Sequence, residues 1–326
     1  MKTKILMCLK QQKGYLSGEE LSKQLGVSRT AVWKAIRRLR EDGYTIEAVR
    51  NRGYRLADSG DVYSEAELKS ILHTKKAGQR LFFFDKVDST NNKAKQLAEA
   101  GEPDGTLVVA ETQCAGKGRR GRQWLSPKGT GIWMSLVLRP EITPGQAAML
   151  TLVAALAVSE GIAVATGLKT GIKWPNDIVM NGKKLCGILT EMNTEMGDIN
   201  YVVVGIGINV NTQDFPDDIK STATSLALEG KQPVKRSRLI HTILQAWEQY
   251  YAVYLQTADL TGLMQEYNDR LVNCNRQVTV LKPEGSYAGI SYGIDRLGRL
   301  LVEKGDKTVE VVMSGEVSVR GIYGYV

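Results

Sequence analysis

The chain has 326 residues, of which 43% are hydrophobic and 24% charged, which is ordinary for a soluble protein of two or three globular domains. Its formal net charge of +8 is too small to establish a nucleic-acid partner, so the positions of the cations matter more. The four cysteines, Cys8, Cys114, Cys186 and Cys274, form no C-x-x-C pair, which argues against a zinc site and a disulfide framework and fits a reducing cytoplasm.

The N-terminal segment carries no targeting signal that we can identify. It is basic and partly apolar, but Lys10-Gln11-Gln12-Lys13 interrupts it before a signal-peptide core is complete. The apolar stretches elsewhere fall short of the roughly 20 residues that a membrane span needs. We therefore expect a cytoplasmic protein with no membrane partner.

The first sixty residues predict three helices. Apolar residues repeat at helical spacing over residues 3–13, with Gly14 as a candidate C-cap. A capping-box pattern begins at Ser17, and Ser28 is placed as the N-cap of a third helix over residues 28–42. Two helices joined by a short turn with glycine are typical of a helix-turn-helix.

A basic hairpin follows, with strands expected over residues 44–49 and 54–56. Such a wing can reach phosphates or the minor groove while the preceding helix reads the major groove. The segment resembles the winged helix-turn-helix of bacterial repressors, although a winged helix that docks on a protein is the alternative. The residues expected to contact DNA lie on the third helix and in the wing: Ser28, Arg29, Thr30, Trp33, Lys34, Arg37, Arg38, Arg50 and Arg52.

A polar linker over residues 57–64 leads into a region of alternating strand-like and helix-like segments that ends near residue 273. We expect strands over residues 81–84, 106–110, 132–138, 186–191 and 201–206. We expect helices over residues 89–100, 144–160 and 237–255. This order predicts a mixed α+β or α/β core of roughly 200 residues.

Four polar motifs in this region carry the candidate chemistry. The first is Asp88-Ser89-Thr90-Asn91-Asn92, which taken alone indicates ordinary helix capping. The second, over residues 116–124, contains G-x-G-x-x-G, but the loop-like residues 125–131 follow it where a dinucleotide-binding fold needs a helix. No G-K-[ST] ends it, so it is not a P-loop.

What remains of the second motif is a glycine-rich loop that carries four cations and Trp124. Such a loop can wrap phosphates with backbone N–H groups and guanidinium groups, while the indole covers a base or a ring. A flexible basic tract or an RNA-binding patch is the alternative.

The third motif is Lys173-Trp174-Pro175-Asn176-Asp177, followed by Lys184 at the foot of a strand, where its ammonium can meet a carboxylate or a phosphate. A simple hairpin with exposed lysines is the alternative. The fourth motif covers residues 205–211, where glycines permit close backbone approach to a ligand and Asn209 offers a donor and an acceptor to a purine edge. A β-bulge is the alternative for these glycines.

Together the four motifs resemble those of the biotin–protein ligases, which share a superfamily with the lipoate–protein ligases. With the winged helix and the C-terminal region, the resemblance covers essentially the whole chain and fits the bifunctional ligase–repressor subgroup that senses biotin in bacteria. The chain departs from it at Lys117, where many relatives carry arginine and lysine loses the guanidinium fork. Cys114 beside Gln113 is also unusual, and neither change removes the site.

The resemblance implies roles for the matching residues. Those implied in biotin binding are Ser89, Thr90, Asn91, Gln113, Gly116, Lys117, Gly118, Arg119, Lys184 and Gly187. Those implied in nucleotide binding are Arg119, Arg120, Arg122, Trp124, Lys173, Asn176 and Asn209. Lys184 and Arg119 are the implied catalytic residues, and Asp177 is a further candidate for activating the acceptor lysine.

The implied reaction needs no nucleophilic triad, because the biotin carboxylate itself attacks the α-phosphate of ATP. Catalysis would depend on positioning and on neutralising negative charge. Mg²⁺ would bind to the phosphates of ATP, and we expect no tightly bound metal. We expect the two histidines, His73 and His241, to be structural or surface residues.

From Asn275 onward the pattern changes to short strands over residues 278–281, 289–294, 300–303 and 309–312. By resemblance these form a small SH3-like β-barrel. The sequence thus predicts an α+β protein with a winged helix-turn-helix over residues 1–60, a mixed α/β ligase domain of the biotin/lipoate ligase type over 64–273 and an SH3-like domain over 274–326.

The implied partners are a biotin carboxyl carrier protein, a palindromic operator DNA and a second copy of the chain, which would pair when biotinyl-AMP is bound. One alternative is a ligase of the same fold for lipoate or another acyl group. Another is a regulator that binds biotin without catalysis. The intact cationic loop, Lys184 and Asn209 favour catalysis, and the R-R-G-R and K-W-P-N-D segments favour biotin over lipoate.

Overall fold

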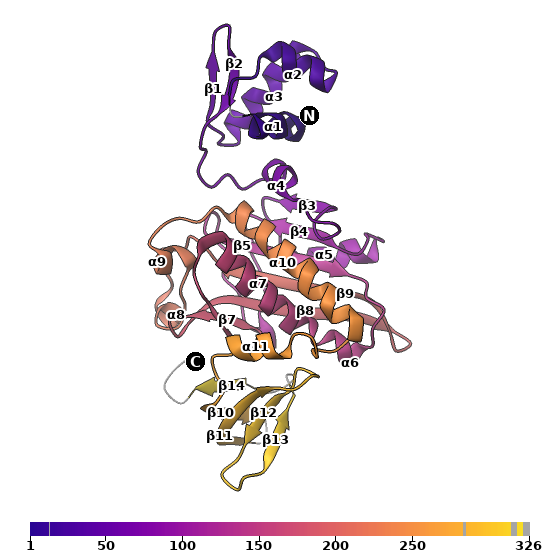
Figure 1. The fold of residues 1–326 in the computed structure, drawn as a ribbon, viewed down its shortest axis with the longest axis vertical. Helices are drawn as coiled ribbons and strands as arrows, with labels where there is room; N and C mark the ends of the chain where they lie inside the picture. Colours follow the sequence, from indigo (N-terminus) through magenta and orange to yellow (C-terminus); the bar gives the residue numbers. More distant parts are fainter. Residues whose placement is uncertain (13, 283–284, 314–317, 322–326) are drawn as a thin grey trace. The chain divides into compact units, whose positions relative to one another are not determined.

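The computed structural model describes residues 1–12, 14–282, 285–313 and 318–321, and Figure 1 gives its elements in chain order. The chain divides into two compact units. The first consists of Met1–His73 and Lys235–His241, and the second of Thr74–Val234 and Thr242–Val326.

The first unit begins with three helices and a hairpin. Its elements are α1 (Lys2–Gln11), α2 (Gly18–Leu25), α3 (Arg29–Glu41), β1 (Ile46–Val49), β2 (Gly53–Leu56) and α4 (Glu65–Ile71). Ser17 and Glu20 form the capping box of α2, and the Ser28 hydroxyl accepts the Ala31 N–H at the start of α3. The expected C-cap at Gly14 was wrong, because α1 ends at Gln11 and Gln12 follows in an extended conformation.

The core of the first unit contains the apolar faces of its helices, on which Ile5, Leu21, Ile36 and Leu39 are almost fully buried. The winged helix-turn-helix expected from the sequence is thus the observed arrangement. Helix α4, which follows the linker and is capped by Ser64, was not expected.

The sheet of the second unit has seven strands among the described residues. They are β3 (Leu81–Phe84), β4 (Thr106–Ala110), β5 (Gly131–Leu138), β6 (Gly171–Lys173), β7 (Asp177–Met180), β8 (Lys183–Glu195) and β9 (Asp198–Asn209). Their order is β3-β4-β5-β9-β8-β7-β6, with β3 and β4 parallel and all other neighbours antiparallel. The five expected strands are confirmed, but β8 and β9 form a longer hairpin than expected.

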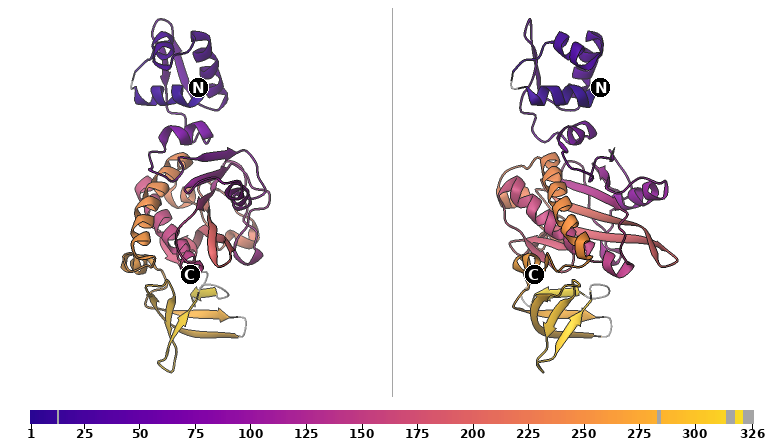
Figure 2. Two further views of the ribbon diagram at one scale, coloured as in Figure 1. Left: turned by 90° about the vertical axis from the view of Figure 1, so that its right-hand side faces the viewer. Right: turned by 45° about the vertical axis from the view of Figure 1, so that its right-hand side comes forward.

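Helices cover both faces of this sheet (Figure 2). Those that pack on its strands include α5 (Thr90–Glu99), α6 (Pro144–Ala147), α7 (Leu150–Thr166) and α11 (Met264–Arg270). The chain also forms α8 (Asp217–Lys220), α9 (Leu226–Gly230) and α10 (Arg236–Thr257). On one face, Ala94 and Ala98 of α5 pack against Val108, Val137 and Val203 of three neighbouring strands. Helix α7 lies on the opposite face, where its Thr151 contacts Thr190 of β8. The site described below is on the α5 side, where Gly205 of β9 adjoins Asn91.

Helix α7 is apolar on all sides and central to the core. One segment, Pro144–Thr166, is long and apolar enough to cross a membrane, but 72% of its most apolar window is buried inside the protein, as in a core helix. The expectation that all apolar stretches are too short to span a membrane was therefore wrong for the length of this segment. The single helix expected over residues 144–160 is also divided, since α6 ends at Ala147 and α7 extends to Thr166.

The C-terminal region is a small β domain. Its strands are β10 (Arg276–Lys282), β11 (Gly285–Ile294), β12 (Leu300–Glu303), β13 (Val309–Val312) and β14 (Ser318–Gly321), in the order β13-β12-β11-β10-β14. All neighbours are antiparallel, and the described strands form an open sheet, so the expected closed barrel was not found. Buried Trp174 donates from Nε1 to the Gly298 carbonyl at 3.0 Å, so the β11–β12 turn contacts the third motif.

Candidate functional site

The first motif places three buried polar residues at the start of α5. Ser89 occupies the N-cap position, but its side chain makes no capping hydrogen bond, so ordinary capping does not explain it. The Thr90 N–H donates to Gln113 Oε1 at 2.8 Å, and the Thr90 hydroxyl lies 3.1 Å from the same oxygen. Gln113 in turn donates to the Ser126 hydroxyl at 2.8 Å, so this part of the site is held from two loops.

Three glycines of β8 and β9 leave room beside these polar residues. A Cβ on Gly205 would lie 2.0 Å from Asn91 Oδ1, and a Cβ on Gly207 would lie 2.7 Å from Trp124 Nε1. A Cβ on Gly187 would lie 2.9 Å from Trp124 as well. Pairing between the two strands is regular at these positions, so the glycines serve close approach rather than a β-bulge.

The glycine-rich loop contains a short 3₁₀ turn, η1 (Arg119–Gly121). Its Arg120 has a φ of 57°, and the Gly118 N–H donates to the Arg122 carbonyl at 2.7 Å, so the loop doubles back. Lys117 Nζ donates to Asn92 Oδ1 at 2.9 Å, which connects the loop to α5. Gly116 packs on the Trp124 backbone, since its Cβ would lie 2.4 Å from the Trp124 carbonyl oxygen.

Arg119 extends from this loop towards the third motif. Its Nη1 donates to Asn176 Oδ1 at 2.9 Å, and burial lowers the pKa of its guanidinium while nearby Asp177 opposes that shift. Asn176 donates to the Ile188 carbonyl at 3.2 Å, and Lys184 forms an ion pair of 2.7 Å with Asp177. The alternative of a hairpin with exposed lysines holds only in part, because β7 and β8 form a hairpin but Lys173 is buried and Lys184 is paired.

Two adjacent cavities contain these residues. The smaller is lined by Ser89, Thr90, Asn91, Gln113, Lys117, Gly118, Arg119, Trp124, Asn176, Lys184, Gly187, Ile188, Leu189, Gly205, Ile206 and Gly207. The larger, of about 560 Å³, includes Arg119, Arg120, Arg122, Trp124, Lys173, Asn176, Lys184 and Asn209 in its lining. The two linings share Gly118, Arg119, Trp124, Asn176 and Lys184.

The structure therefore brings the predicted biotin residues other than Gly116 into the smaller cavity and the predicted nucleotide residues into the larger one. Sequence reasoning missed one segment of the larger cavity: Thr212, Asp214, Phe215, Pro216, Asp218, Ile219, Thr222 and Ala223. The apolar pair Phe215-Pro216 in an otherwise polar loop was the available signal.

Trp124 lies at the boundary of the two cavities. Its Nε1 is buried and has no hydrogen-bond partner among the described residues. Lys184 Nζ lies 5.3 Å from the centre of its ring, and Trp133 packs edge-on at 6.4 Å between ring centroids. A buried indole donor beside an ammonium suits an anionic ligand atom.

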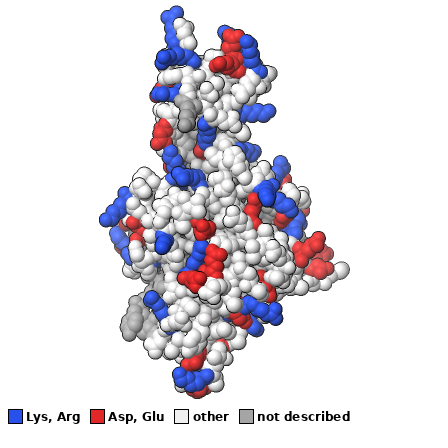
Figure 3. Space-filling view, in the orientation of Figure 1, with Lys and Arg blue, Asp and Glu red and all other residues white. Residues whose placement is uncertain are grey.

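The residues expected to contact DNA are all exposed in the first unit. Figure 3 shows lysine and arginine side chains on this unit, including the tip of the β1–β2 hairpin. Two of the expected residues are paired, Arg29 with Glu19 and Arg37 with Glu41. Arg40, by contrast, is structural, because its Nε donates to the Ile46 carbonyl at 3.0 Å.

Other candidate residues lie outside both cavities. His73 and His241 contact each other edge-on in the first unit, and Cys114 is exposed with its thiol 3.3 Å from the Val87 carbonyl. Burial raises the pKa of the Cys186 thiol, which makes it a poor nucleophile. No group of three or more His, Cys, Asp or Glu in the described part of the chain is arranged to hold a metal ion.

Three family models match the chain. The Biotin/lipoate A/B protein ligase family model matches residues 83–209. An HTH domain model matches residues 2–55, and a Biotin protein ligase C terminal domain model matches residues 274–320.

Relatives match over most of their length. The chain is 45% identical over 291 residues to the bifunctional ligase/repressor BirA of Bacillus spizizenii, covering 89% of each chain. It is 31% identical to the bifunctional ligase/repressor BirA of Escherichia coli, covering 93% of this chain and 92% of that protein. The solved biotin protein ligase from Aquifex aeolicus in complex with biotin and ATP has a TM-score of 0.65 and 29% identity, covering 74% of this chain and 99% of that chain.

Proposed function

We propose two activities for this chain, which belongs to the family of bifunctional ligase/repressors. It activates biotin with ATP and transfers the biotinyl group to a lysine of a biotin carboxyl carrier protein. It also represses transcription in response to biotin. The family model and the relatives span both the ligase and the helix-turn-helix regions.

The observation that carries the ligase function is the boundary shared by the two cavities. Lys184, Arg119 and Trp124 line both, so an acid bound in the smaller cavity meets a nucleotide bound in the larger one at these side chains. A carboxylate and an α-phosphate repel each other unless cations lie between them. Lys184 and Arg119 supply those cations where the two substrates meet.

The smaller cavity suits the ring system of biotin. Ser89, Thr90, Asn91 and Gln113 offer donors and acceptors to a ureido group, while Gly187, Gly205 and Gly207 leave space for the fused rings. Gly118, Arg119 and Lys117 lie on the loop side of the ligand, and Gly116 shapes the loop from outside the cavity.

The larger cavity suits ATP. Arg120, Arg122 and Lys173 face the phosphates, and Asn176, Asn209 and Trp124 lie on the adenosine side. Phe215 and Ile219 of the segment after β9 add apolar surface for the base. ATP brings Mg²⁺ on its phosphates as part of the substrate.

In the first step, a biotin carboxylate oxygen attacks the α-phosphorus, the bond to the β-phosphate oxygen breaks, and pyrophosphate leaves. Lys184 holds the carboxylate, and Arg119 stabilises charge on the α-phosphate. In the second step, a carrier lysine amine attacks the acyl carbon of biotinyl-AMP, AMP leaves, and the amine loses a proton. We assign the assistance of that proton loss to Asp177, and its ion pair with Lys184 supports this role.

The glycine-rich loop shields the mixed anhydride from water between the two steps. Its connection to α5 through Lys117 and Asn92 favours a closed position over the smaller cavity.

The repressor function uses the first unit. The exposed cations of α3 and the wing read the two halves of a palindromic operator when two copies of the chain pair. Biotinyl-AMP is the corepressor, because an ordered loop favours the homodimer. Operator affinity that stays constant when biotin and ATP are added would contradict this part of the proposal.

The remaining expectations follow the same reasoning. The domains extend over residues 1–60, 64–273 and 274–326, the C-terminal sheet belongs to the SH3-like class, and the protein acts in the cytoplasm. Contact between the β11–β12 turn and Trp174 supports a role for the C-terminal domain beside the nucleotide cavity.

The first experiment is exchange of labelled pyrophosphate into ATP, with biotin, lipoate and octanoate offered separately. Exchange with biotin alone supports the proposal. Exchange with lipoate or octanoate keeps the fold and overturns the substrate. No exchange by a folded sample that binds biotin leaves the non-catalytic sensor, which Lys184, Arg119 and Asn209 in the cavity linings argue against.

A further inference from the structure

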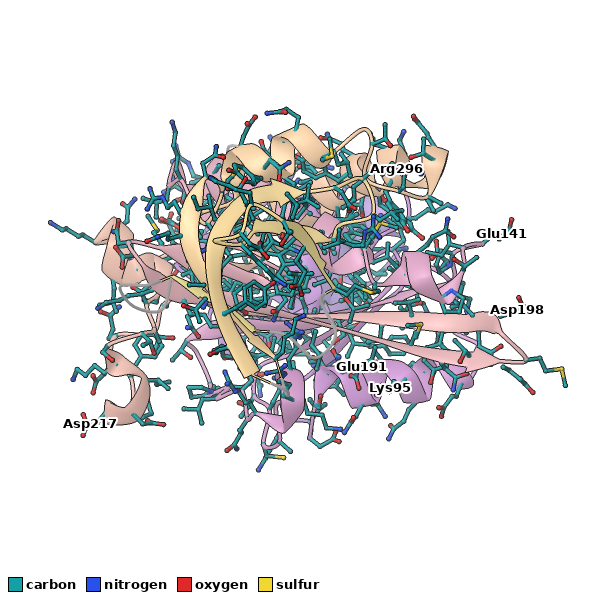
Figure 4. All side chains as sticks on the ribbon, turned by 90° about the horizontal axis from the view of Figure 1, so that it is seen from below. Lys95, Glu141, Glu191, Asp198, Asp217 and Arg296 are labelled. Carbon is teal, nitrogen blue, oxygen red and sulfur yellow. The ribbon has the colours of Figure 1, made fainter. Side chains whose placement is uncertain are left out.

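A buried chain of hydrogen bonds runs beneath the smaller cavity. Ser135 of β5 is fully buried, and its hydroxyl lies 2.8 Å from the Thr90 hydroxyl and 2.7 Å from Asn91 Oδ1. Asn91 Nδ2 lies 2.7 Å from Glu191 Oε2, and Lys95 Nζ lies 2.5 Å from Glu191 Oε1. Figure 4 labels Glu191 and Lys95, which lie next to each other.

Only some residues of this hydrogen-bonded series line the cavity. Thr90 and Asn91 line it, whereas Ser135 and Glu191 do not. Gly205 is paired with Ser135 across the sheet, and a Cβ there would occupy the place of Asn91 Oδ1. Ser135 and Glu191 therefore act on a ligand through Thr90 and Asn91 alone.

Two acceptors determine the orientation of the Asn91 amide: Glu191 Oε2, at 2.7 Å from the Asn91 NH₂, and the more distant Leu189 carbonyl, at 3.2 Å. Burial raises the pKa of its carboxyl, but hydrogen bonds from Lys95 and Asn91 outweigh burial, so the pKa lies below its usual range and the group is ionised at neutral pH. A carboxylate accepts hydrogen bonds and cannot donate them. Asn91 must therefore direct its NH₂ to Glu191 and its oxygen to Ser135.

The orientation of Asn91 in turn directs two hydroxyl protons. Asn91 Oδ1 only accepts, so the single proton of Ser135 goes to it at 2.7 Å. The Ser135 oxygen then accepts the Thr90 hydroxyl proton at 2.8 Å. Any other arrangement leaves one of these two short contacts without a proton. This arrangement leaves a proton missing only from the longer contact, 3.1 Å between the Thr90 hydroxyl and Gln113 Oε1. That oxygen already accepts the Thr90 N–H.

We propose that Glu191, through Asn91 and Ser135, holds the Thr90 hydroxyl as a hydrogen-bond acceptor towards the cavity, so that the site selects a cyclic urea by its N–H group. A dithiolane or an unbranched acyl chain has no N–H to offer Thr90. Glu191 and Ser135 are thus positioning residues for substrate specificity. This inference rests on the proposed function, since it takes biotin as the ligand.

The test compares biotin with its two ureido N-methyl isomers by titration calorimetry on the full chain. In the wild type, the isomer methylated at the nitrogen that faces Thr90 should bind much more weakly than biotin. In Glu191→Gln the side-chain amide can also donate, so the Asn91 NH₂ keeps only the longer contact to the Leu189 carbonyl as an obligatory acceptor and the amide turns over more readily. Affinity for biotin should then fall about tenfold, which corresponds to about 1.4 kcal/mol.

The discriminating readout is the ratio of the two affinities. Glu191→Gln should reduce the preference for biotin over that isomer about tenfold, while the KM for ATP stays within about twofold. Ser135→Ala is the second variant, because it leaves the Thr90 proton only Gln113 as an acceptor and should reduce the ratio similarly. Glu195→Gln, on the exposed end of β8, is the matched control and should leave the ratio unchanged.

The outcomes separate the two proposals. A wild type that binds lipoate and not biotin overturns the proposed function and this inference with it. A wild type that binds biotin, with variants that lose affinity for biotin and its isomer in equal proportion, overturns this inference alone. Thermal unfolding of each variant shows whether a folded protein was titrated.

Discussion

Gly187, Gly205 and Gly207 explain why a cavity exists on one face of a sheet whose other positions are filled. Neighbouring residues on β5 and β9 are packed against α5, whereas these three positions carry no side chain. The space they leave adjoins Trp124 and Asn91, so the size of the site depends on the absence of three methyl groups.

Gly207→Ala tests this dependence. The new methyl group would lie 2.7 Å from Trp124 Nε1 and must displace the indole into the space meant for ligand. We expect the KM for biotin to rise at least tenfold, or about 1.4 kcal/mol, in steady-state adenylation assays. Gly145→Ala is the control, because nothing lies within 4 Å of that position, and its KM should not change.

His241 gives the first unit a stability that depends on pH. Burial lowers the pKa of its imidazole, and His73 adds to the effect. A lowered pKa means that the unfolded chain binds a proton more readily than the folded one. The contribution of His241 to stability is therefore present above about pH 6.5 and is lost as the pH falls below that value.

His241→Asn should reduce this loss. Unfolding is followed by the emission of Trp33 at about pH 7.5 and about pH 5.5, on either side of the ordinary histidine pKa of about 6.5. The unfolding midpoint should drop less for the variant than for the wild type. An equal drop in both proteins would mean that other groups carry the dependence.

At the scale of elements, the wing depends on one backbone conformation. Gly53 begins β2 with a φ of 104°, and a Cβ there would lie 2.1 Å from the Leu16 carbonyl oxygen. The backbone pairs of Leu16 and Tyr54, at 2.9 and 2.8 Å, hold the hairpin against the start of α2.

Gly53→Ala should therefore separate the two activities. We expect DNA affinity to fall at least tenfold in a fluorescence anisotropy assay, about 1.4 kcal/mol, because the wing must shift. Pyrophosphate exchange with biotin should remain at the wild-type rate. A parallel loss of both activities would show that the wing also serves the ligase.

Periodic elements could be predicted from the sequence, whereas loops with function could not. Caps at Ser17 and Ser28 located α2 and α3, because capping depends on local hydrogen bonds. The break between α6 and α7 escaped prediction, since apolar residues continue through it. Residues 212–223 were missed because their place in the larger cavity comes from β9 and the chain fold, and not from local pattern.

The predicted site followed a similar division. Motif residues such as Lys184 and Asn176 could be proposed because the resemblance assigns them position by position, and both line the two cavities. Ser135 and Glu191 carry no motif signal, since a serine and a glutamate in strands look like ordinary sheet residues. Their relation to Thr90 appears only when β5, β8 and α5 are brought together.

At the scale of the whole molecule, the net charge of +8 belongs to the first unit, because the 26 basic and 26 acidic residues of the second unit cancel. DNA binding should therefore depend on the cations of the first unit. Arg50 and Arg52 in the wing are exposed and should contact phosphates. Replacing both with alanine should reduce the slope of log affinity against log salt by about 1.8, since each phosphate contact contributes about 0.9.

Electrophoretic mobility or anisotropy titrations at several salt concentrations measure that slope. Arg296→Ala is the control, because Arg296 is exposed in the second unit and pairs with Asp259. An unchanged slope in the wing variant would place the phosphate contacts on α3.

Tryptophan positions give the molecule two optical probes. Trp33 is 52% exposed on α3, whereas Trp133, Trp174 and Trp247 are at most 2% exposed. Trp124 lies where the cavities meet, and its indole N–H has no partner in the part of the chain that the structure describes. Indole fluorescence responds to the polarity around the ring. Binding of biotin and ATP should therefore change the fluorescence of Trp124, and binding of DNA should change the fluorescence of Trp33. With Trp33→Phe and Trp124→Phe to separate the signals, both ligands become visible in one cuvette without a label, and the order in which they bind can be timed.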